Sequence, residues 1–221
     1  MNFVISIINP DQINALGEIC RSLNIPLGVG FIGKGTAVRS MLELLGIDSS
    51  DKRVVAAVAT EEKTKQLIQE EKRNLYIGVP GHGIIVAVPV KSVGGGKTMA
   101  LLNDGQQPEG KAPEINYSYE LVVVICNSGW TDMVMNAARE AGAAGGTVIH
   151  GKGTGAAEEE KFYKVSIAQE KEVILIVSRA EQKAEIMKAI LGKAGPDTAA
   201  AAIVFSLPVT EVAGFGMFEE K

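Results

Sequence analysis

Residues 33–36 read GKGT, and residues 151–154 read GKGT again. The two tetrapeptides belong to a longer repeat, because residues 3–37 align without a gap on residues 121–155, with nine of the 35 positions identical. Both aligned segments open with an apolar stretch that ends in asparagine, FVISIIN up to Asn9 and LVVVICN up to Asn127. Two copies at such a long spacing indicate a duplicated domain, since a solenoid needs three or more repeats.

The repeat continues to the end of each copy after a one-residue change of offset. Residues 54–58 (VVAAV) align with 173–177 (VILIV), and residues 84–93 align with 203–212. A polar segment with several glycines and prolines separates the copies, which is typical of a linker. The sequence therefore predicts an N-terminal domain at 1–102, a linker at 103–117 and a C-terminal domain at 118–221.

Each copy shows signals for strand, helix, strand, strand, helix and strand, in that order. Asn9 and Pro10 are expected to begin the first helix of the first copy, and Asn127 or Ser128 that of the second. The second helices are predicted at 60–72 and 179–191, with Thr60 and Ser178 as their cap residues.

This order of elements predicts an α+β fold of two tandem ferredoxin-like (βαββαβ) sandwiches. In such a sandwich both helices lie on one face of an antiparallel sheet. The other face is apolar and must be covered, so we expect it to pack against the second copy or another subunit. A homo-oligomer is therefore expected. A single continuous sheet would contradict two separate sandwiches.

Composition excludes several classes of protein. The chain has 221 residues, 46% of them hydrophobic, a net charge of -4 and a pI near 5.4. These values fit a compact protein and leave no basic stripe for nucleic acid. The longest apolar runs are far shorter than the roughly 20 residues that a membrane span requires. Together with two cysteines in apolar runs, Cys20 and Cys126, this predicts a reduced, cytoplasmic protein without membrane insertion.

The glycine-rich stretch 28–35, GVGFIGKG, imitates a phosphate-binding loop. A true P-loop leaves a strand and opens a helix, whose amino end holds the phosphate. This stretch instead follows a predicted helix, and its counterpart GTVIHGKG at 146–153 contains β-branched residues typical of a strand. We therefore expect strands here, and neither a P-loop nor a Rossmann site.

Three segments of the second copy, at 140–155, 162–177 and 203–212, resemble the PII signal-transduction family, the nitrogen regulatory proteins. The resemblance covers roughly residues 120–216, and the first copy looks like the same fold through the repeat. It implies a trimeric, non-catalytic sensor that binds adenine nucleotides, and in many members 2-oxoglutarate, in clefts between subunits. It also implies a long T-loop that contacts a protein target.

The resemblance assigns roles to individual residues. Thr147 matches the family threonine near the adenine, and residues 152–155 match the K-G-F-G sequence at the base of the T-loop. Ala202 stands where the family has a phosphate-binding lysine, and Ala156-Ala157 replaces an arginine-glutamine pair. Each lost charge-assisted hydrogen bond would weaken phosphate binding about tenfold or more.

The candidate ligand-binding residues come from both GKGT segments and their surroundings. They are Gly33, Lys34, Gly35, Thr36, Thr147, Gly151, Lys152, Gly153, Thr154 and Gly155. For Lys34 and Lys152, anion binding and a solvated loop lysine remain alternatives. No catalytic residue and no metal ligand is predicted, because no nucleophile-base pair or ligand spacing stands out.

The sequence thus favours a regulatory protein that is not an enzyme. It would sense a small anionic ligand, with ATP, ADP or AMP as candidates, and would regulate a protein target through residues 155–170, in nitrogen regulation as the resemblance implies. Two alternatives remain: an assembly scaffold without a ligand, and an enzyme that uses a cleft between the copies.

Overall fold

The computed structural model describes residues 1–26, 28–36, 50–79, 81–94, 96–105, 114–153, 161–162, 165–166 and 170–214, with only the backbone for 161–162 and 165–166. The strands are β1 (Asn2–Ile8), β2 (Gly28–Gly35), β3 (Asp51–Ala59), β4 (Gly83–Pro89), β5 (Asn116–Asn127), β6 (Thr147–Lys152), β7 (Lys161–Phe162), β8 (Val165–Ser166), β9 (Glu170–Arg179), β10 (Ile203–Val209) and β11 (Glu211–Ala213). The helices are η1 (Pro10–Gln12), α1 (Ile13–Ser22), α3 (Glu61–Asn74), α4 (Gly96–Leu102), α5 (Thr131–Glu140) and α6 (Lys183–Ala194).

The strands fall into two ferredoxin-like sets. The first copy contributes β2-β3-β1-β4 and the second β10-β5-β9-β6, so both place their first and third strands in the centre. Every neighbouring pair of these strands is antiparallel. The predicted α+β ferredoxin-like fold is therefore confirmed, while the domain boundaries at 103–117 stay a prediction.

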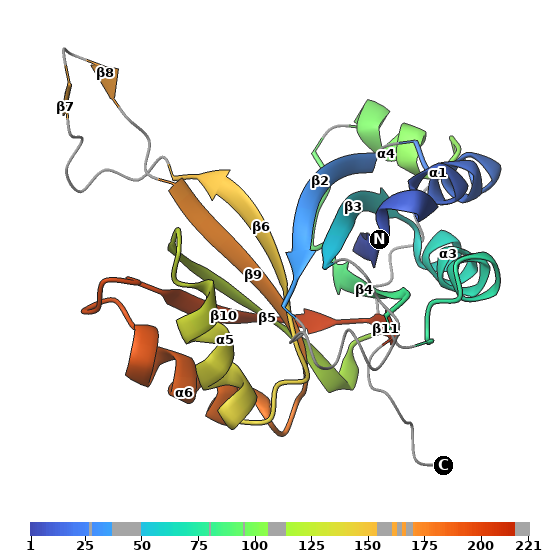
Figure 1. The fold of residues 1–221 in the computed structure, drawn as a ribbon. Helices are drawn as coiled ribbons and strands as arrows, with labels where there is room; N and C mark the ends of the chain where they lie inside the picture. The colour runs from blue at the N-terminus through green and yellow to red at the C-terminus, as the bar shows by residue number, and fades with distance from the viewer. Residues whose placement is uncertain are drawn as a thin grey trace.

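We expected two separate sheets, but the two sets of strands form one sheet. The edge strands β2 and β6 pair with each other, and β11 pairs with β4, so one sheet of nine strands runs through both copies. The expectation that a continuous sheet would exclude two sandwiches was wrong, because an edge-to-edge junction leaves the strand order of each copy intact. Figure 1 shows β2 and β6 converging at this junction and diverging beyond it.

Apolar side chains fill three cores. Helices α5 and α6 cover the outer face of the second copy's strands, and α1 and α3 cover that of the first, on opposite sides of the molecule in Figure 1. The third core lies between the inner faces of the two copies and includes Ile5, Ile7, Val54 and Val86 with Leu121, Val123, Leu175 and Val177. We expected each open sheet face to pack against the other copy or another subunit, and the residues of this third core do pack against the other copy.

Helix starts agree with the sequence in the first copy but not in the second. Thr60 caps α3 by accepting a hydrogen bond from the Lys63 amide at 3.2 Å, and Asn9 with Pro10 begins η1, which leads into α1. Ser178 does not cap α6, because β9 continues through Arg179 and the helix begins only at Lys183. Similarly, α5 begins after Trp130, without a side-chain cap from Asn127 or Ser128.

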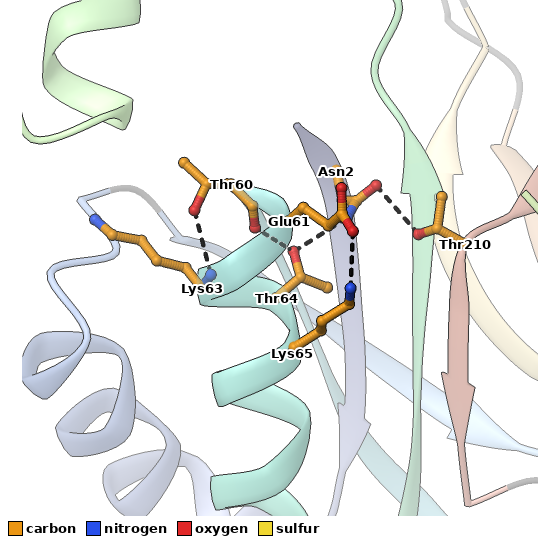
Figure 2. Close-up of polar contacts among 7 residues, drawn as sticks. All are labelled: Asn2, Thr60, Glu61, Lys63, Thr64, Lys65 and Thr210. Carbon is orange, nitrogen blue, oxygen red and sulfur yellow. Dashed lines mark hydrogen bonds and ion pairs between the residues drawn. The ribbon is translucent and has the colours of Figure 1, made fainter. Parts of the chain in front are cut away.

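A buried polar network ties the carboxyl end of the second copy to the first copy (Figure 2). The Thr210 hydroxyl donates to Oδ1 of Asn2 at 3.1 Å, and Nδ2 of Asn2 donates to the Thr64 hydroxyl at 3.3 Å. Asn2 and Thr64 are fully buried, so these bonds satisfy polar groups that water cannot reach. The network fixes the chain at Thr210, between β10 and β11.

Two further predictions can be compared with the described part of the chain. Residues 28–35 form strand β2, as the sequence analysis expected. Among the helices that the structure describes, none combines the length and apolarity that crossing a bilayer demands.

Candidate functional site

A cleft lies where the two copies meet, with a volume of about 240 Å³. Its floor is apolar and comes from both inner sheet faces, with Ile7 and Val86 from the first copy and Leu175 and Val177 from the second. The rest of its lining includes glycines, two threonines and a lysine. They are Gly35, Thr36, Lys52, Gly81, Gly83, Gly145, Gly146, Thr147 and Gly214.

Backbone pairing brings the two halves of this lining together. Gly35 pairs with Thr147 across the β2–β6 junction, and Gly33 pairs with Ile149. A side chain on Gly33 would lie 3.1 Å from Val54 and 3.2 Å from Thr147, so the glycine lets the two copies approach closely. The first GKGT segment thus makes the junction through its glycines.

Thr36 locks the junction at the edge of the cleft. Its hydroxyl accepts from the Gly146 amide at 2.9 Å and donates to the Gly146 carbonyl at 3.0 Å, and its own amide donates to that carbonyl at 3.0 Å. The Arg139 guanidinium also donates to the Thr36 carbonyl. This threonine therefore acts first as a structural link between the copies.

We expect Thr36→Val to lower the free energy of unfolding by about 1–2 kcal/mol, because it leaves the partly buried Gly146 amide without its hydroxyl partner. Urea denaturation of the purified variant measures this loss. Thr36→Ser keeps the hydroxyl and should stay close to the parent protein. Equal losses in both variants would show that the hydroxyl contributes nothing.

Lys52 is the cation on the wall of the cleft, and the sequence analysis missed it. Its ammonium donates to Oδ1 of Asn9 at 2.5 Å and to the Gly81 carbonyl at 3.0 Å. Burial lowers its pKa below the usual lysine value, and the charge of Asp11 opposes this only in part. Within the described residues, no carboxylate lies at ion-pair distance from Lys52.

The second copy repeats this lysine-asparagine pair. The Lys171 ammonium donates to Oδ1 of Asn127 at 2.5 Å, and the two residues are the repeat counterparts of Lys52 and Asn9. Both asparagines end the apolar run of a first strand, and both lysines stand two positions before the apolar run of a third strand. This regularity in the printed sequence was the signal that could have identified Lys52.

The residue after Lys171 in β9, Glu172, is a buried carboxylate that bonds the start of α5. Glu172 accepts hydrogen bonds from the Gly129 amide at 3.0 Å and from the Thr131 hydroxyl at 2.7 Å. Burial alone would raise the pKa of Glu172, but these bonds outweigh it and hold the pKa below its usual value. Nδ1 of the exposed His150 lies 3.7 Å from the same carboxylate. Glu172 therefore stays ionised and anchors the start of α5 to β9.

The predicted site residues divide into three groups. Gly35, Thr36 and Thr147 line the cleft, and Gly33 lies just behind Thr147. Lys34 pairs with Val148 in the junction but is exposed, and Gly151, Lys152 and Gly153 lie at or just beyond the far end of β6. None of these four lines the cleft. Thr154 and Gly155 lie outside the described residues. A ligand role for these residues stays a prediction.

The comparison with protein families finds a match in the second copy. The family model "Nitrogen regulatory protein P-II" matches residues 119–215. No curated protein matches the chain significantly. The chain is also similar to the crystal structure of Arabidopsis thaliana PII bound to citrate, with 21% sequence identity and a TM-score of 0.33. The aligned part covers 43% of this chain and 78% of the Arabidopsis chain.

Two solved structures match almost the whole chain at lower similarity. One is described as a monooxygenase from Fusobacterium nucleatum, at 9% identity, 97% and 94% coverage of the two chains and a TM-score of 0.29. The other is a mutant chlorite dismutase from Candidatus Nitrospira defluvii, at 11% identity, 95% and 91% coverage and a TM-score of 0.23. Scores this low support no conclusion about function. Residues 119–215, which match the family model of nitrogen regulatory protein P-II, contain the ferredoxin-like strand set of the second copy, and the likeness to that family is confined to these residues.

Proposed function

We propose that this chain is a P-II-like regulatory protein that binds a small organic anion in the cleft between its two copies. The observation that carries this proposal is the half-buried ammonium of Lys52 on the cleft wall, whose hydrogen-bond partners among the described residues are two neutral oxygens, those of Asn9 and Gly81. A partly buried cation with no carboxylate at ion-pair distance among the described residues is costly, because the charge of Asp11 offsets the burial only in part. An anion in the cleft would supply a closer counter-charge. Thr36 and Thr147 add hydroxyl groups to the lining.

The size of the cleft favours a small carboxylate or phosphate over a whole nucleotide. Its volume of about 240 Å³ lies below the range of about 300–1,000 Å³ that is common for sites of drug-sized ligands. ATP, ADP and AMP are the second candidates, because Thr147, which the family resemblance places near the adenine, lies on the cleft wall.

The proposed output of the protein is the segment 155–170, which would contact a protein target. Strand β6 connects the two sites, since Thr147 lines the cleft and Lys152, at the other end, leads into this segment. Five residue steps of strand span about 16 Å. A ligand that shifts Thr147 would therefore move the base of the segment. Regulation of nitrogen metabolism is the family role that this proposal carries over.

Calorimetry against citrate, 2-oxoglutarate, AMP, ADP and ATP tests ligand binding directly. We expect at least one of these anions to bind, and Lys52→Gln to weaken its affinity about tenfold or more, because a charge-assisted hydrogen bond is lost. Lys34→Gln is the matched control, since Lys34 is exposed and does not line the cleft.

The outcomes of this experiment separate the candidate functions. A folded protein that gives no heat with any of the five anions contradicts the ligand proposal and favours an assembly scaffold. A larger effect of Lys34→Gln than of Lys52→Gln would show that the anion binds outside this cleft. Consumption of the bound anion would favour an enzyme, for which Lys52 would be the first candidate catalyst.

The effect of a ligand on the segment 155–170 is a separate prediction. Trypsin cleaves after lysine, and the segment contains Lys161 and Lys164. We expect saturation with the anion found by calorimetry to change the cleavage rate at these two positions at least threefold. Lys72, in α3 and far along the chain from the segment, provides the internal control. An unchanged rate at saturation would contradict the proposed coupling.

A further inference from the structure

The core of the first copy contains three polar positions that the second copy fills with apolar residues. Ser6 of β1 and Glu71 of α3 are buried there, and Cys20 of α1 is partly buried in the same core. The repeat counterparts of these three are apolar and fully buried: Val124, Ala138 and Ile190. Since the second copy forms the same strand order without them, the fold does not require a carboxyl group at position 71.

The carboxyl group of Glu71 has no counter-charge. Its Oε1 accepts a hydrogen bond from the Ser6 hydroxyl at 2.6 Å, and its Oε2 has no hydrogen-bond partner among the described residues. The strands β1, β3, β4 and β11 contribute no buried titratable side chain to this core in the part of the chain that the structure describes. From α1 comes the Cys20 thiol, which stays neutral because burial, and then the charge of Glu71, raises its pKa to about 11.

Two short connections lead from Glu71 to the cleft between the copies. Along β1, Ser6 faces α3, and the next residue, Ile7, faces the floor of the cleft, because successive side chains of a strand point to opposite faces. Along the chain, the Glu71 carbonyl accepts from the amides of Leu75 at 2.9 Å and Ile77 at 3.4 Å. The last turn of α3 therefore holds Ile77 in place.

Ile77 is buried directly behind the wall of the cleft. A Cβ at Gly83 would lie 2.8 Å from its side chain, and a Cβ at Gly214 would lie 3.1 Å from it. Both glycines line the cleft, and so does Gly81, whose carbonyl accepts from the Lys52 ammonium at 3.0 Å. A change at the end of α3 is thus transmitted to the wall that carries Lys52.

We propose that the charge of Glu71 regulates the cleft, which binds its anion tightly while Glu71 is neutral and more weakly once Glu71 is ionised. This inference rests on the proposed function, because it concerns the same anion. An anion on the Ile7 side of β1 and a carboxylate on the Ser6 side are separated by about 10 Å, the spacing of packed layers. At this distance within a protein, repulsion between two like charges weakens binding about tenfold.

The direction of the pH dependence follows from the state of Glu71 in the folded protein. Burial raises the pKa of Glu71 to about 7, so the neutral form predominates below this pH and the carboxylate above it. Linkage requires that the bound anion strengthens proton binding by the same factor, about tenfold. The affinity is therefore highest in mild acid, falls as the pH rises through about 7, and levels off above about 8. The cleft would respond to both the anion and the pH.

Calorimetry at several pH values between about 6 and 9 tests this regulation, with citrate, 2-oxoglutarate, AMP, ADP and ATP as probes. We expect the affinity of the parent protein to fall about tenfold more across this range than that of Glu71→Gln, which stays neutral. Titration of the anion or of Lys52 affects both proteins equally and cancels in the comparison. Glu70→Gln is the matched control and should follow the parent, because Glu70 bonds Arg73 and Asn74 at the surface.

Proton uptake provides a second readout, which a merely structural role of Glu71 would not change. Titrations at pH 7 in buffers of different ionisation enthalpy give the number of protons taken up with the anion. We expect the parent to take up about 0.4 proton more than Glu71→Gln. Ser6→Ala removes the bond that favours the ionised form of Glu71, so the fall in affinity should move to higher pH.

The outcomes separate this inference from the proposed function. An anion that binds with the same pH dependence and the same proton uptake in the parent and in Glu71→Gln would contradict regulation by Glu71 and leave the anion site intact. A shift to lower pH in Ser6→Ala would show that another group titrates. If none of the five anions binds either protein at pH 6, the proposed function and this inference are both wrong.

Discussion

Replacing Glu71 by glutamine is expected to stabilise the protein by about 3 kcal/mol at pH 8 and by almost nothing near pH 4.5. Glu71 lies in α3 and is fully buried. One carboxylate oxygen accepts a hydrogen bond from the Ser6 hydroxyl at 2.6 Å, while the other, Oε2, has no hydrogen-bond partner among the described residues. Burial raises the pKa of Glu71 from 4.5 to about 7, although the bond from Ser6 opposes the shift.

The sign of the pH effect follows from this pKa. The folded protein binds the proton more tightly than the unfolded chain, so the stabilisation is complete below the unfolded pKa of 4.5. It is lost as the pH rises to about 7, and the cost of the buried charge then stays constant. Glutamine remains neutral, so the Glu71→Gln variant does not pay this cost.

Urea denaturation of the parent protein and the variant between pH 4.5 and 8.5 measures the difference. Glu70→Gln is the matched control, because Glu70 is the neighbouring residue in α3 and bonds Arg73 and Asn74 at the surface. This control should change stability by at most about 0.5 kcal/mol over the whole range. A constant difference between parent and Glu71→Gln would contradict the raised pKa of Glu71.

The strand order of each copy could be predicted from the sequence, because it depends on local patterns. The apolar runs 3–9 and 121–127, with the helices behind them, specify one unit twice. How the two units meet could not be predicted. The strand pairing at the β2–β6 junction consists of backbone hydrogen bonds, which leave no side-chain pattern. The side chains that matter there, the glycine at position 33 and the Thr36 hydroxyl, gain their meaning only from residues more than 100 positions away.

The candidate site could also be predicted only in part, because some of its residues belong to local sequence patterns and others do not. Thr147, Gly35 and Thr36 were found through the repeat and the family resemblance, and all three line the cleft. Lys52 was missed because it lies inside a strand, where an isolated lysine resembles a solvated residue. Its position becomes informative only through Asn9 and the Gly81 carbonyl, which are 43 and 29 residues away along the chain.

Gly83→Ala is the second substitution with a large expected effect, a loss of about 4 kcal/mol in the free energy of unfolding. Gly83 has a φ of +141°, and a Cβ there would lie 2.3 Å from the Ile7 carbonyl oxygen and 2.8 Å from Ile77. Ile7 belongs to β1, which is held between β3 and β4 in the centre of the first copy's strands. The backbone at Ile7 therefore cannot move aside without breaking two strand pairings.

Gly78→Ala separates the two causes of this loss. Gly78 has a φ of +115°, but a Cβ there meets no atom within 4 Å, so only the cost of the left-handed backbone, about 1–2 kcal/mol, should appear. The difference between the variants in urea denaturation then measures the clash with β1. If both variants lose the same stability, the sheet adapts to a side chain at Gly83 and the expected clash with β1 is absent.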